Sequence, residues 1–412
     1  MTTFRSGCES GSSDIQLVQP GWGVVVALSI DPYHRVAVAY GRERSVDIAE
    51  AFIASALARS GATAALVRRS DLEWIGSFGS QDVAALSLLD QPWSFGAHAV
   101  DLDGVVHYLD LAMGIVRAAD FPVTVADEEI VSAADAALSR ALVDGLSAVI
   151  ANPSLAQSLQ REIAVANALI TADDDDFPVY YQPIVRLSDD VTVGWESLLR
   201  WTTAGSVRSP DAFMPVAEAT SLIIPIGRRA IRAVFADLAG RIGRTEGDEA
   251  FISINLSAKQ LWDESLPAYF AELGAEYGVE PSRVWIEVSE IDVIRPAGAA
   301  ARTLFALHDL GCTICVDDLG SGFSALRYVR DLPVEVLKVD RTLVTPLPDS
   351  ASDRAVVDAI CTMAKATGLR VVAEGIETQD ELDEVTKLCF DLGQGYLLGR
   401  PAAAADLFGP AR

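Results

Sequence analysis

Lysine is scarce in this sequence, and positive charge as a whole is outnumbered. The four lysines are Lys259, Lys338, Lys365 and Lys387, so arginine supplies nearly all of the basic charge. With 32 basic against 58 acidic residues, the formal net charge is -26. The overall field of so acidic a chain does not attract nucleic acid or anionic lipid, which excludes binding by net charge alone. Any anionic ligand must therefore be bound at a local site.

Cysteine is also rare, with five residues in 412. So few cysteines, odd in number, argue against a disulfide-stabilised secreted scaffold and favour a reducing compartment. Cys312 and Cys315 have the C-x-x-C spacing of redox and zinc sites. They lie inside a strand pattern with no second pair nearby, so we expect both thiols to pack in the core.

Long apolar runs are absent. No uninterrupted stretch approaches the length of a membrane span, and the N-terminus has no signal-peptide pattern, so we expect a cytoplasmic protein. The composition, 50% hydrophobic and 22% charged, is typical of a globular chain. The length suffices for two domains, each with its own core.

The pattern divides the chain into four parts. Small polar residues predict a flexible tail, and a mixed α/β domain follows it. A helical linker then leads to a run of four aspartates and a proline, after which strands and helices alternate regularly. The predicted parts are 1–19, 20–152, 153–175 and 176–406. In the first domain and the linker we expect a strand from Val24, a strand over 64–67, and helices over 46–59, 132–149 and 155–169.

The last part has the rhythm of repeated strand-then-helix units. About 230 residues of this pattern predict a (β/α)8 barrel of TIM-like type, with a doubly wound open sheet as the alternative. The expected strands are 177–185, 193–201, 251–257, 284–289, 313–318, 334–339, 369–374 and a weaker one over 390–398. The expected helices are 211–219, 225–238, 266–277, 297–310, 353–367 and 379–388.

Two adjacent carboxylates end one of these strands. Asp317 and Asp318 follow a β-branched run and precede a turn that contains Gly320 and Gly322. Two such charges repel each other, and a divalent cation between them would relieve the repulsion. A helix N-cap with a spare acid in a turn explains the stretch equally well.

Other strands also end in a charged or amide side chain. Such a residue is costly to bury in an apolar strand without partners. Because strand ends converge on one rim of a barrel, we expect these side chains to lie together there. They are Glu196, Asn255, Glu287, Asp317, Asp318, Lys338, Glu374 and Gln394.

Five of these residues offer oxygen ligands and none is histidine or cysteine. Carboxylate and amide oxygens suit Mg²⁺ or Mn²⁺ and argue against zinc. Two ions sharing an aspartate are the usual arrangement for displacement at phosphorus. The five are Glu196, Asn255, Glu287, Asp317 and Asp318.

The motifs around these residues resemble those of the EAL domain family of cyclic di-GMP phosphodiesterases. They are Y-Q-P-I-V from Tyr181, E-S-L-L-R-W from Glu196, N-L-S from Asn255, E-V-S-E from Glu287, D-D-L-G-S-G from Asp317, L-K-V-D from Leu337, A-E-G-I-E from Ala373 and Q-G-Y-L-L-G-R-P from Gln394. The resemblance implies hydrolysis of cyclic di-GMP to linear pGpG, with the five oxygen donors as ligands of two Mg²⁺ or Mn²⁺ ions. It also implies a homodimer.

The resemblance assigns roles to the remaining positions. Lys338 corresponds to the residue that positions water, Glu374 to the general base, and Glu290 to an anchor of the loop after Asp318. Substrate contacts correspond to Gln182, Leu198, Arg200 and Gln394. Two positions depart from the family pattern: Ser197 replaces alanine, which should be harmless, and Leu319 replaces phenylalanine, which would loosen the following loop.

The first domain contains S-I-D-P-Y-H-R-V from Ser29 with Tyr40-Gly41, and Gly114-Ile115 followed by A-D-A-A-L from Ala134. These stretches resemble the opening and closing elements of a GGDEF domain, the fold of diguanylate cyclases, in a degenerate form. Ser29 stands where the family has its first metal-binding acid, and Ala37 and Val38 replace its guanine-binding residues. Residues 70–74 read S-D-L-E-W where the family has its Gly-Gly-Asp-Glu-Phe motif. The glycines that let a phosphate approach the backbone are missing, so we expect no cyclase activity. A regulatory role with GTP or a protein regulator and a dimerising role both stay open. For the whole chain, the alternatives to an enzyme are an inactive cyclic di-GMP receptor that signals through protein partners and a docking platform.

Overall fold

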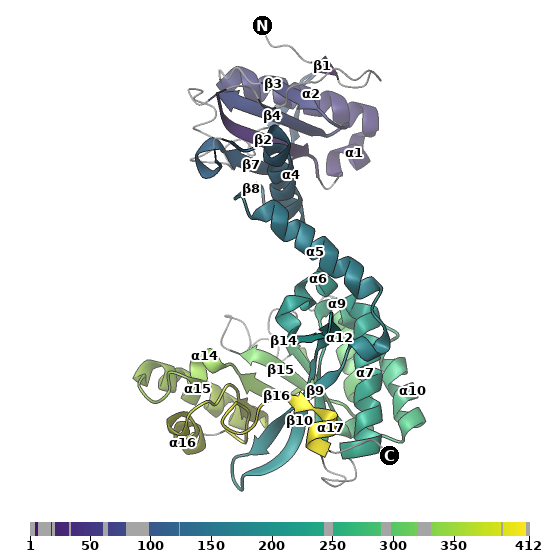
Figure 1. The fold of residues 1–412 in the computed structure, drawn as a ribbon, viewed down its shortest axis with the longest axis vertical. Coiled ribbons are helices and arrows are strands. Elements are labelled where there is room, and N and C mark those ends of the chain that lie inside the picture. The colour runs from purple at the N-terminus through teal and green to yellow at the C-terminus, as the bar shows by residue number, and fades with distance from the viewer. Residues whose placement is uncertain are drawn as a thin grey trace. The chain divides into compact units, whose positions relative to one another are not determined.

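The computed structural model describes residues 5–6, 18, 21–32, 34–60, 65–79, 99–122, 124–242, 250–289, 298–319, 331–388 and 390–408. The chain forms two compact units, Met1–Ala164 and Val165–Arg412. Both units are α/β (Figure 1). Most of the predicted tail, 1–19, lies outside the described residues. Among the described helices, none combines the length and apolar character needed to cross a membrane.

Unit 1 is built on a six-stranded sheet covered by helices on both faces. Alternate residues of the central strand point to opposite sides. Val24 and Val26 pack with α2 in one apolar cluster, and Val25 and Ala27 pack with α4 in another. In order across the sheet the strands are β1 (Arg5–Ser6), β3 (Ala65–Arg68), β4 (Glu73–Gly79), β2 (Trp22–Ile30), β7 (Leu111–Arg117) and β8 (Ala148–Ile150). The remaining elements are α1 (Arg35–Tyr40), α2 (Arg42–Ser60), β5 (Ala99–Leu102), β6 (Val105–Tyr108) and α4 (Asp127–Asp144). Helix α5 (Leu155–Ile170) begins in unit 1 and ends in unit 2.

The predicted helix over 132–149 is wrong at its end. Helix α4 stops at Asp144 because Gly145 adopts a left-handed conformation, with φ 66°, and caps it. Residues Ala148–Ile150 instead form β8, which pairs in parallel with β7. The apolar run after the glycine therefore belongs to the sheet.

Unit 2 contains an eight-stranded barrel, which confirms the predicted barrel and excludes the open sheet. The strands are β10 (Val191–Leu199), β13 (Phe251–Asn255), β14 (Val284–Ser289), β15 (Thr313–Leu319), β16 (Val334–Val339), β17 (Arg370–Ala373), β18 (Leu392–Gly393) and β9 (Val179–Arg186). The ring closes where β9 pairs with both β10 and β18. Both pairings are antiparallel, so the first two strands form a hairpin and depart from a uniform β/α repeat.

Helices surround the barrel (Figure 1). They are α6 (Met214–Ala219), α7 (Ile223–Asp237), α9 (Ala258–Leu261), α10 (Leu266–Tyr277), α12 (Ala299–Asp309), α14 (Arg341–Val344), α15 (Ala351–Thr367), α16 (Gln379–Lys387) and α17 (Ala404–Phe408). Three short strands lie outside the ring: β11 (Trp201–Thr203) and β12 (Ser206–Arg208) form a hairpin, and β19 (Ala402–Ala403) pairs with β9. The strands are buried on both faces, which explains their nearly continuous apolar runs.

The barrel interior has an apolar layer at one level. Its side chains come from alternate residues of the strands, whereas the intervening residues pack toward the helices. Cys315 belongs to this layer and Cys312 to the outer core, and both are buried free thiols, which confirms the core packing predicted for them. The layer consists of Ile184, Phe251, Trp285, Cys315, Val336, Val372 and Leu392.

Candidate active site

The polar residues predicted at the strand ends form the next level of the barrel interior. Five of them follow a residue of the apolar layer by two positions along a parallel strand, as in the pairs Trp285 and Glu287 or Val336 and Lys338. Asn255 follows Phe251 by four positions, and Asp318 is adjacent to Asp317. Gln182 precedes Ile184 by two residues because β9 runs in the opposite direction. The period of two thus places one row of polar side chains at the carboxyl-end mouth of the barrel.

Lys338 is the centre of this row. Its ammonium group lies 2.6 Å from Glu374 Oε1, 2.9 Å from Glu287 Oε2, 3.6 Å from Asp317 Oδ1 and 3.8 Å from Glu196 Oε2. The lysine side chain is only 1% exposed. Four carboxylates from four strands therefore surround one buried cation.

Burial and crowding shift the pKa values of these groups. Burial raises the pKa of Glu287 to about 8; Lys338 opposes the rise, and Glu196 and Asp317 add to it. Burial also raises the pKa of Glu374 well above its usual range. For Lys338 burial alone would lower the pKa, but the four surrounding carboxylates outweigh it and raise the pKa. The site thus holds more negative charge than one lysine neutralises.

Glu196 is held by two amide side chains. Asn255 Nδ2 donates to Glu196 Oε1 at 2.8 Å, and Gln394 Nε2 donates to Glu196 Oε2 at 2.6 Å. Gln394 Nε2 also lies 3.1 Å from Gln182 Oε1, and Gln182 in turn donates to the carbonyl of Gly399 at 3.0 Å. These bonds fix the orientation of the Glu196 carboxylate and bring together four of the predicted site residues.

A cavity of about 300 Å³ opens beside the carboxylates. Leu198, Asn255, Glu287, Asp317 and Asp318 are among the residues that line it. Its volume is at the lower end of the range of small-molecule sites. The mouth of the barrel therefore offers both a charged cluster and adjacent space for a ligand.

Arg200 lies just beyond the end of β10. Its guanidinium stands over the ring of Tyr180 at 5.3 Å, and Nη1 donates to the carbonyl of Leu199 at 3.1 Å. Burial lowers the pKa of Arg200, while the charges of Glu196 and Asp211 oppose the decrease. Among the predicted substrate contacts, Arg200 is the only cation. The predicted loop anchor, Glu290, lies outside the described residues.

The sequence interpretation missed two features next to the predicted ligands. Ser197 Oγ donates to the carbonyl of Ser253 at 2.6 Å, so this departure from the family pattern links the strands that carry Glu196 and Asn255. Asp340 lies close enough to Asp318 to contribute to its raised pKa. The motif L-K-V-D contained Asp340, but its proximity to Asp318 depends on the pairing of β15 with β16.

The donor set fits a hard divalent cation. Carboxylate oxygens of Asp317, Asp318 and Glu374 lie within 4.8 Å of one another. Glu287 Oε1 is buried and has no hydrogen-bond partner in the described part of the chain. Burial and the neighbouring Asp317 raise the pKa of Asp318 to about 6. An orphaned acceptor beside crowded carboxylates is what a cation would relieve.

Addition of Mn²⁺ or Mg²⁺ is therefore expected to stabilise unit 2 against unfolding. A ligand that binds only the folded state at a hundredfold excess over its Kd contributes about 2.7 kcal/mol. Thermal unfolding with and without the metal measures the effect. The double variant Asp317→Asn, Asp318→Asn should lose most of the metal-dependent shift, and Glu335→Gln, an exposed change on β16, should keep it. An equal shift in all three proteins would contradict the site.

Gly395 is expected to tolerate no side chain. An added Cβ would lie 2.1 Å from the carbonyl oxygen and 2.2 Å from the nitrogen of Ile376, so the backbones would have to separate. Gly395→Ala should lower the free energy of unfolding by about 1–3 kcal/mol and displace Gln394 from Glu196. Denaturant unfolding checks the change. Gly79→Ala is the control, because nothing lies within 4 Å of its Cβ position, and a Gly395→Ala protein as stable as this control would contradict the prediction.

An eight-stranded barrel with a carboxylate-rich mouth at the carboxyl ends of its strands defines the class of unit 2. Residues 162–401 match the EAL domain family, and the chain belongs to this family. No GGDEF domain is detected in the N-terminal region.

Relatives of known or assigned activity share this region. The cyclic di-GMP phosphodiesterase PA2567 of Pseudomonas aeruginosa is 35% identical over 282 residues, which are 68% of this chain and 47% of that protein. The probable cyclic di-GMP phosphodiesterase PdeB of Escherichia coli is 34% identical over 235 residues, 57% of this chain and 44% of that protein. The chain spans less than half the length of these curated relatives.

A solved structure supports the same assignment of fold. The PaMucR phosphodiesterase in complex with c-di-GMP has a TM-score of 0.55 and 31% identity, covering 61% of this chain and all of that one. The EAL enzyme Bd1971, bound to cAMP and cyclic-di-GMP, has a TM-score of 0.57 and 31% identity, covering 61% of this chain and 69% of that one.

Proposed function

We propose that the barrel of unit 2 hydrolyses cyclic di-GMP to linear pGpG. The observation that carries this proposal is the arrangement of Glu196, Glu287, Asp317 and Glu374 around Lys338 at the mouth of an EAL family barrel. Two relatives with this domain are named as cyclic di-GMP phosphodiesterases, which supports the choice of substrate.

The proposed metal site uses Glu196, Asn255, Glu287, Asp317 and Asp318. Two Mg²⁺ or Mn²⁺ ions held there would neutralise phosphate charge and acidify a water molecule. The protein orients these ligands through its own bonds, since Asn255 and Gln394 fix Glu196, and the Asp318 amide donates to Asp317 Oδ1 at 2.8 Å.

Glu374 is the proposed general base. Burial favours its protonated form, which suits a group that accepts a proton during the reaction. Lys338, 2.6 Å from Glu374 Oε1, opposes this rise in the pKa of Glu374, and its proposed role is to hold the attacking water in line. Water forms a new bond to phosphorus, the bond from phosphorus to the ribose 3′ oxygen breaks, and that oxygen takes up a proton.

Arg200, Leu198, Gln182 and Gln394 are the proposed substrate contacts. The planar guanidinium of Arg200, held over Tyr180, can bind a phosphate or guanine edge with two parallel hydrogen bonds. Gln394 Oε1 is buried without a hydrogen-bond partner among the described residues, so it can accept a bond from substrate.

The experiment that tests the function is incubation of the purified chain with cyclic di-GMP and Mg²⁺, followed by chromatography of the products. We expect pGpG to accumulate with repeated turnover and EDTA to stop it. Cyclic di-GMP that is bound but recovered intact would favour the receptor and overturn the enzyme.

For unit 1 we propose a degenerate GGDEF-like domain with a regulatory or dimerising role and no cyclase activity. Ser29 lies buried in β2, where the cyclase family has an acid. Arg42 and Arg68 both donate to Asp71 in the β3–β4 connection, and the pKa of Asp71 is lowered by these bonds. Of the two acids at the position of the lost motif, Asp71 is thus paired with arginine, and Glu73 is exposed at the start of β4.

This proposal predicts that the chain makes no cyclic di-GMP from GTP and Mg²⁺. The reason is that Ser29 replaces the family's first metal-binding acid, that the glycines of the motif are missing from residues 70–74, and that Asp71 is paired with arginine. Chromatography after incubation with GTP and Mg²⁺, without added cyclic di-GMP, measures it, and the appearance of cyclic di-GMP or pGpG would contradict it. A change in hydrolysis rate when GTP is added would favour regulation over a purely dimerising role.

A further inference from the structure

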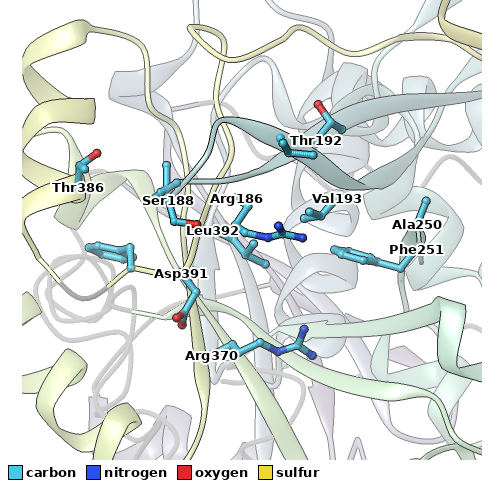
Figure 2. Close-up of a pocket in the computed structure, with 13 residues that line it drawn as sticks. Arg186, Ser188, Thr192, Val193, Ala250, Phe251, Arg370, Thr386, Asp391 and Leu392 are labelled. Atoms are coloured by element: carbon cyan, nitrogen blue, oxygen red, sulfur yellow. The ribbon is translucent and has the colours of Figure 1, made fainter. Parts of the chain in front are cut away.

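The amino-end mouth of the barrel, opposite the carboxylate cluster, contains a second cavity of about 560 Å³. Figure 2 shows its lining. The lining residues come from the end of β9, the β9–β10 turn, the starts of β10, β13, β17 and β18, the segment before β18, and α16. None of these residues belongs to the site proposed for cyclic di-GMP. The volume is within the range of small-molecule sites.

Two arginines face this mouth. Arg186 follows Ile184 by two residues on β9, and Arg370 precedes Val372 by two on β17, so both occupy the inward row of the barrel below its apolar layer. Figure 2 shows both side chains in the lining of the cavity. The barrel thus has carboxylates at one mouth and guanidinium groups at the other.

Arg370 is held in place by a stack of rings. Its guanidinium lies 4.4 Å from the ring centroid of Trp285, and Trp285 stacks on Phe251 with centroids 3.6 Å apart at 5°. A Cβ on Gly194 would lie 2.4 Å from the Phe251 ring, so that ring has no freedom on its other side. The stack orients the guanidinium before any ligand arrives.

Within the described ranges, no carboxylate lies within 4.0 Å of the Arg370 guanidinium. Many other arginines of this acidic chain do form ion pairs. Asp391 also lines the cavity, but its Oδ2 accepts the amide of Val371 at 2.8 Å. Arg186 pairs with Asp189 at 2.9 Å, and both side chains are 45% exposed, so solvent screens that pair.

The rest of the lining is apolar with a few hydroxyl groups. Val193, Leu392 and the edge of Phe251 supply the apolar surface, and Thr192 and Thr386 carry hydroxyls. A ligand for such a cavity needs an anionic group for the arginines and a compact apolar body for the remaining surface.

We propose that this mouth is a second binding site, for a small organic anion in which a phosphate or carboxylate is attached to a compact apolar or aromatic body. The juxtaposition of Arg186 with the ring-stacked Arg370 supplies the anion contacts. The site is independent of the proposed hydrolysis, because it lies at the other end of the barrel and shares no residue with the carboxylate cluster.

Titration calorimetry with the full chain in Mg²⁺ buffer tests the site with four probes. Phenyl phosphate and benzoate carry both features, inorganic phosphate carries only the charge, and phenol carries only the body. We expect saturable binding of phenyl phosphate or benzoate, with mutual displacement, and much weaker binding of phosphate and phenol. Tighter binding of phenyl phosphate indicates a preference for phosphate as the anionic group, and tighter binding of benzoate indicates a preference for carboxylate. The proposal would be overturned if neither phenyl phosphate nor benzoate bound saturably, or if phenol bound as tightly as they do.

Three variants locate the binding. Arg370→Gln and Arg186→Gln should each weaken it on the order of tenfold or more, because each removes a charge-assisted hydrogen bond. Arg208→Gln, an exposed arginine on β12 outside the cavity, should change it less than twofold. The affinity of the carboxylate cluster for Mn²⁺ should be the same in all three variants. This measurement checks that the barrel of each variant is folded. Undiminished affinity in both pocket variants would place the probe elsewhere and overturn the site.

Discussion

Replacement of Glu196 by alanine is expected to reduce hydrolysis of cyclic di-GMP by at least about 10³-fold, because the proposed metals supply several kcal/mol of transition-state stabilisation. Glu196 is the carboxylate that Asn255 and Gln394 orient from two sides, and it lies 3.8 Å from Lys338. Its removal leaves Asn255 without this acceptor and Gln394 with Gln182 alone, and it deprives the proposed metal site of a ligand. The rate of pGpG formation under saturating substrate measures the loss.

The matched control for this variant is Glu335→Ala. Glu335 is an exposed acid on β16, three residues before Lys338, and has no contact with the cluster among the described residues. It should keep the wild-type rate. If Glu196→Ala turned over at the same rate as Glu335→Ala, the carboxylate cluster would not be the active site.

Replacement of Lys338 by methionine is expected to cost both stability and activity. The ammonium is buried among four carboxylates, and loss of one partner of a buried ionic group costs about 3–5 kcal/mol because the remaining charge is uncompensated. We expect this loss in EDTA, with partial recovery in Mn²⁺, since a cation would take over part of the compensation. Hydrolysis should fall by about 10²–10³-fold even with saturating metal.

Denaturant unfolding with EDTA or Mn²⁺ measures the stability part of this prediction. Lys365→Met is the control, because Lys365 is exposed on α15 and forms no ion pair in the described part of the chain. It should change stability by less than about 0.5 kcal/mol. A Lys338→Met protein as stable as this control in EDTA would show that the carboxylates do not depend on the lysine.

Most strands of the barrel could be predicted because they are short runs rich in β-branched residues between turns. The strand expected over 390–398 is only β18, Leu392–Gly393, which has no β-branched residue. The limits of β14 and β16 agree with the predicted ranges 284–289 and 334–339. The antiparallel direction of β9 could not be predicted, because a two-residue alternation is the same in either direction. The end of α4 was missed because the apolar residues after Gly145 fit a helix and a strand equally well.

The site could be predicted as a set of residues but not as a network. Polar side chains at strand ends indicate a common rim, and a period of two explains why they point inward. The contacts of Lys338 with four carboxylates depend on how β10, β14, β15 and β17 close around it, which no local pattern encodes. The same limit applies to the amino-end mouth, where Arg186 and Arg370 are 184 positions apart in the sequence, yet line one cavity.

Leu319 is buried at the end of β15, with its carbonyl accepting the amide of Asp340 at 3.2 Å. The residue therefore packs in the core rather than facing the cavity. Its predicted effect on the following loop stays a prediction, because residues 320–330 lie outside the described residues.

In the proposed reaction, the cluster around Lys338 directs water to a phosphodiester bond of cyclic di-GMP. Turnover in ¹⁸O-labelled water, with Mg²⁺ and mass analysis of the product, tests it most directly. We predict pGpG with one ¹⁸O atom in its terminal phosphate, and no labelled product from Glu196→Ala or Glu374→Gln. Unlabelled, intact cyclic di-GMP after prolonged incubation with a stoichiometric amount of metal-loaded protein would contradict the account.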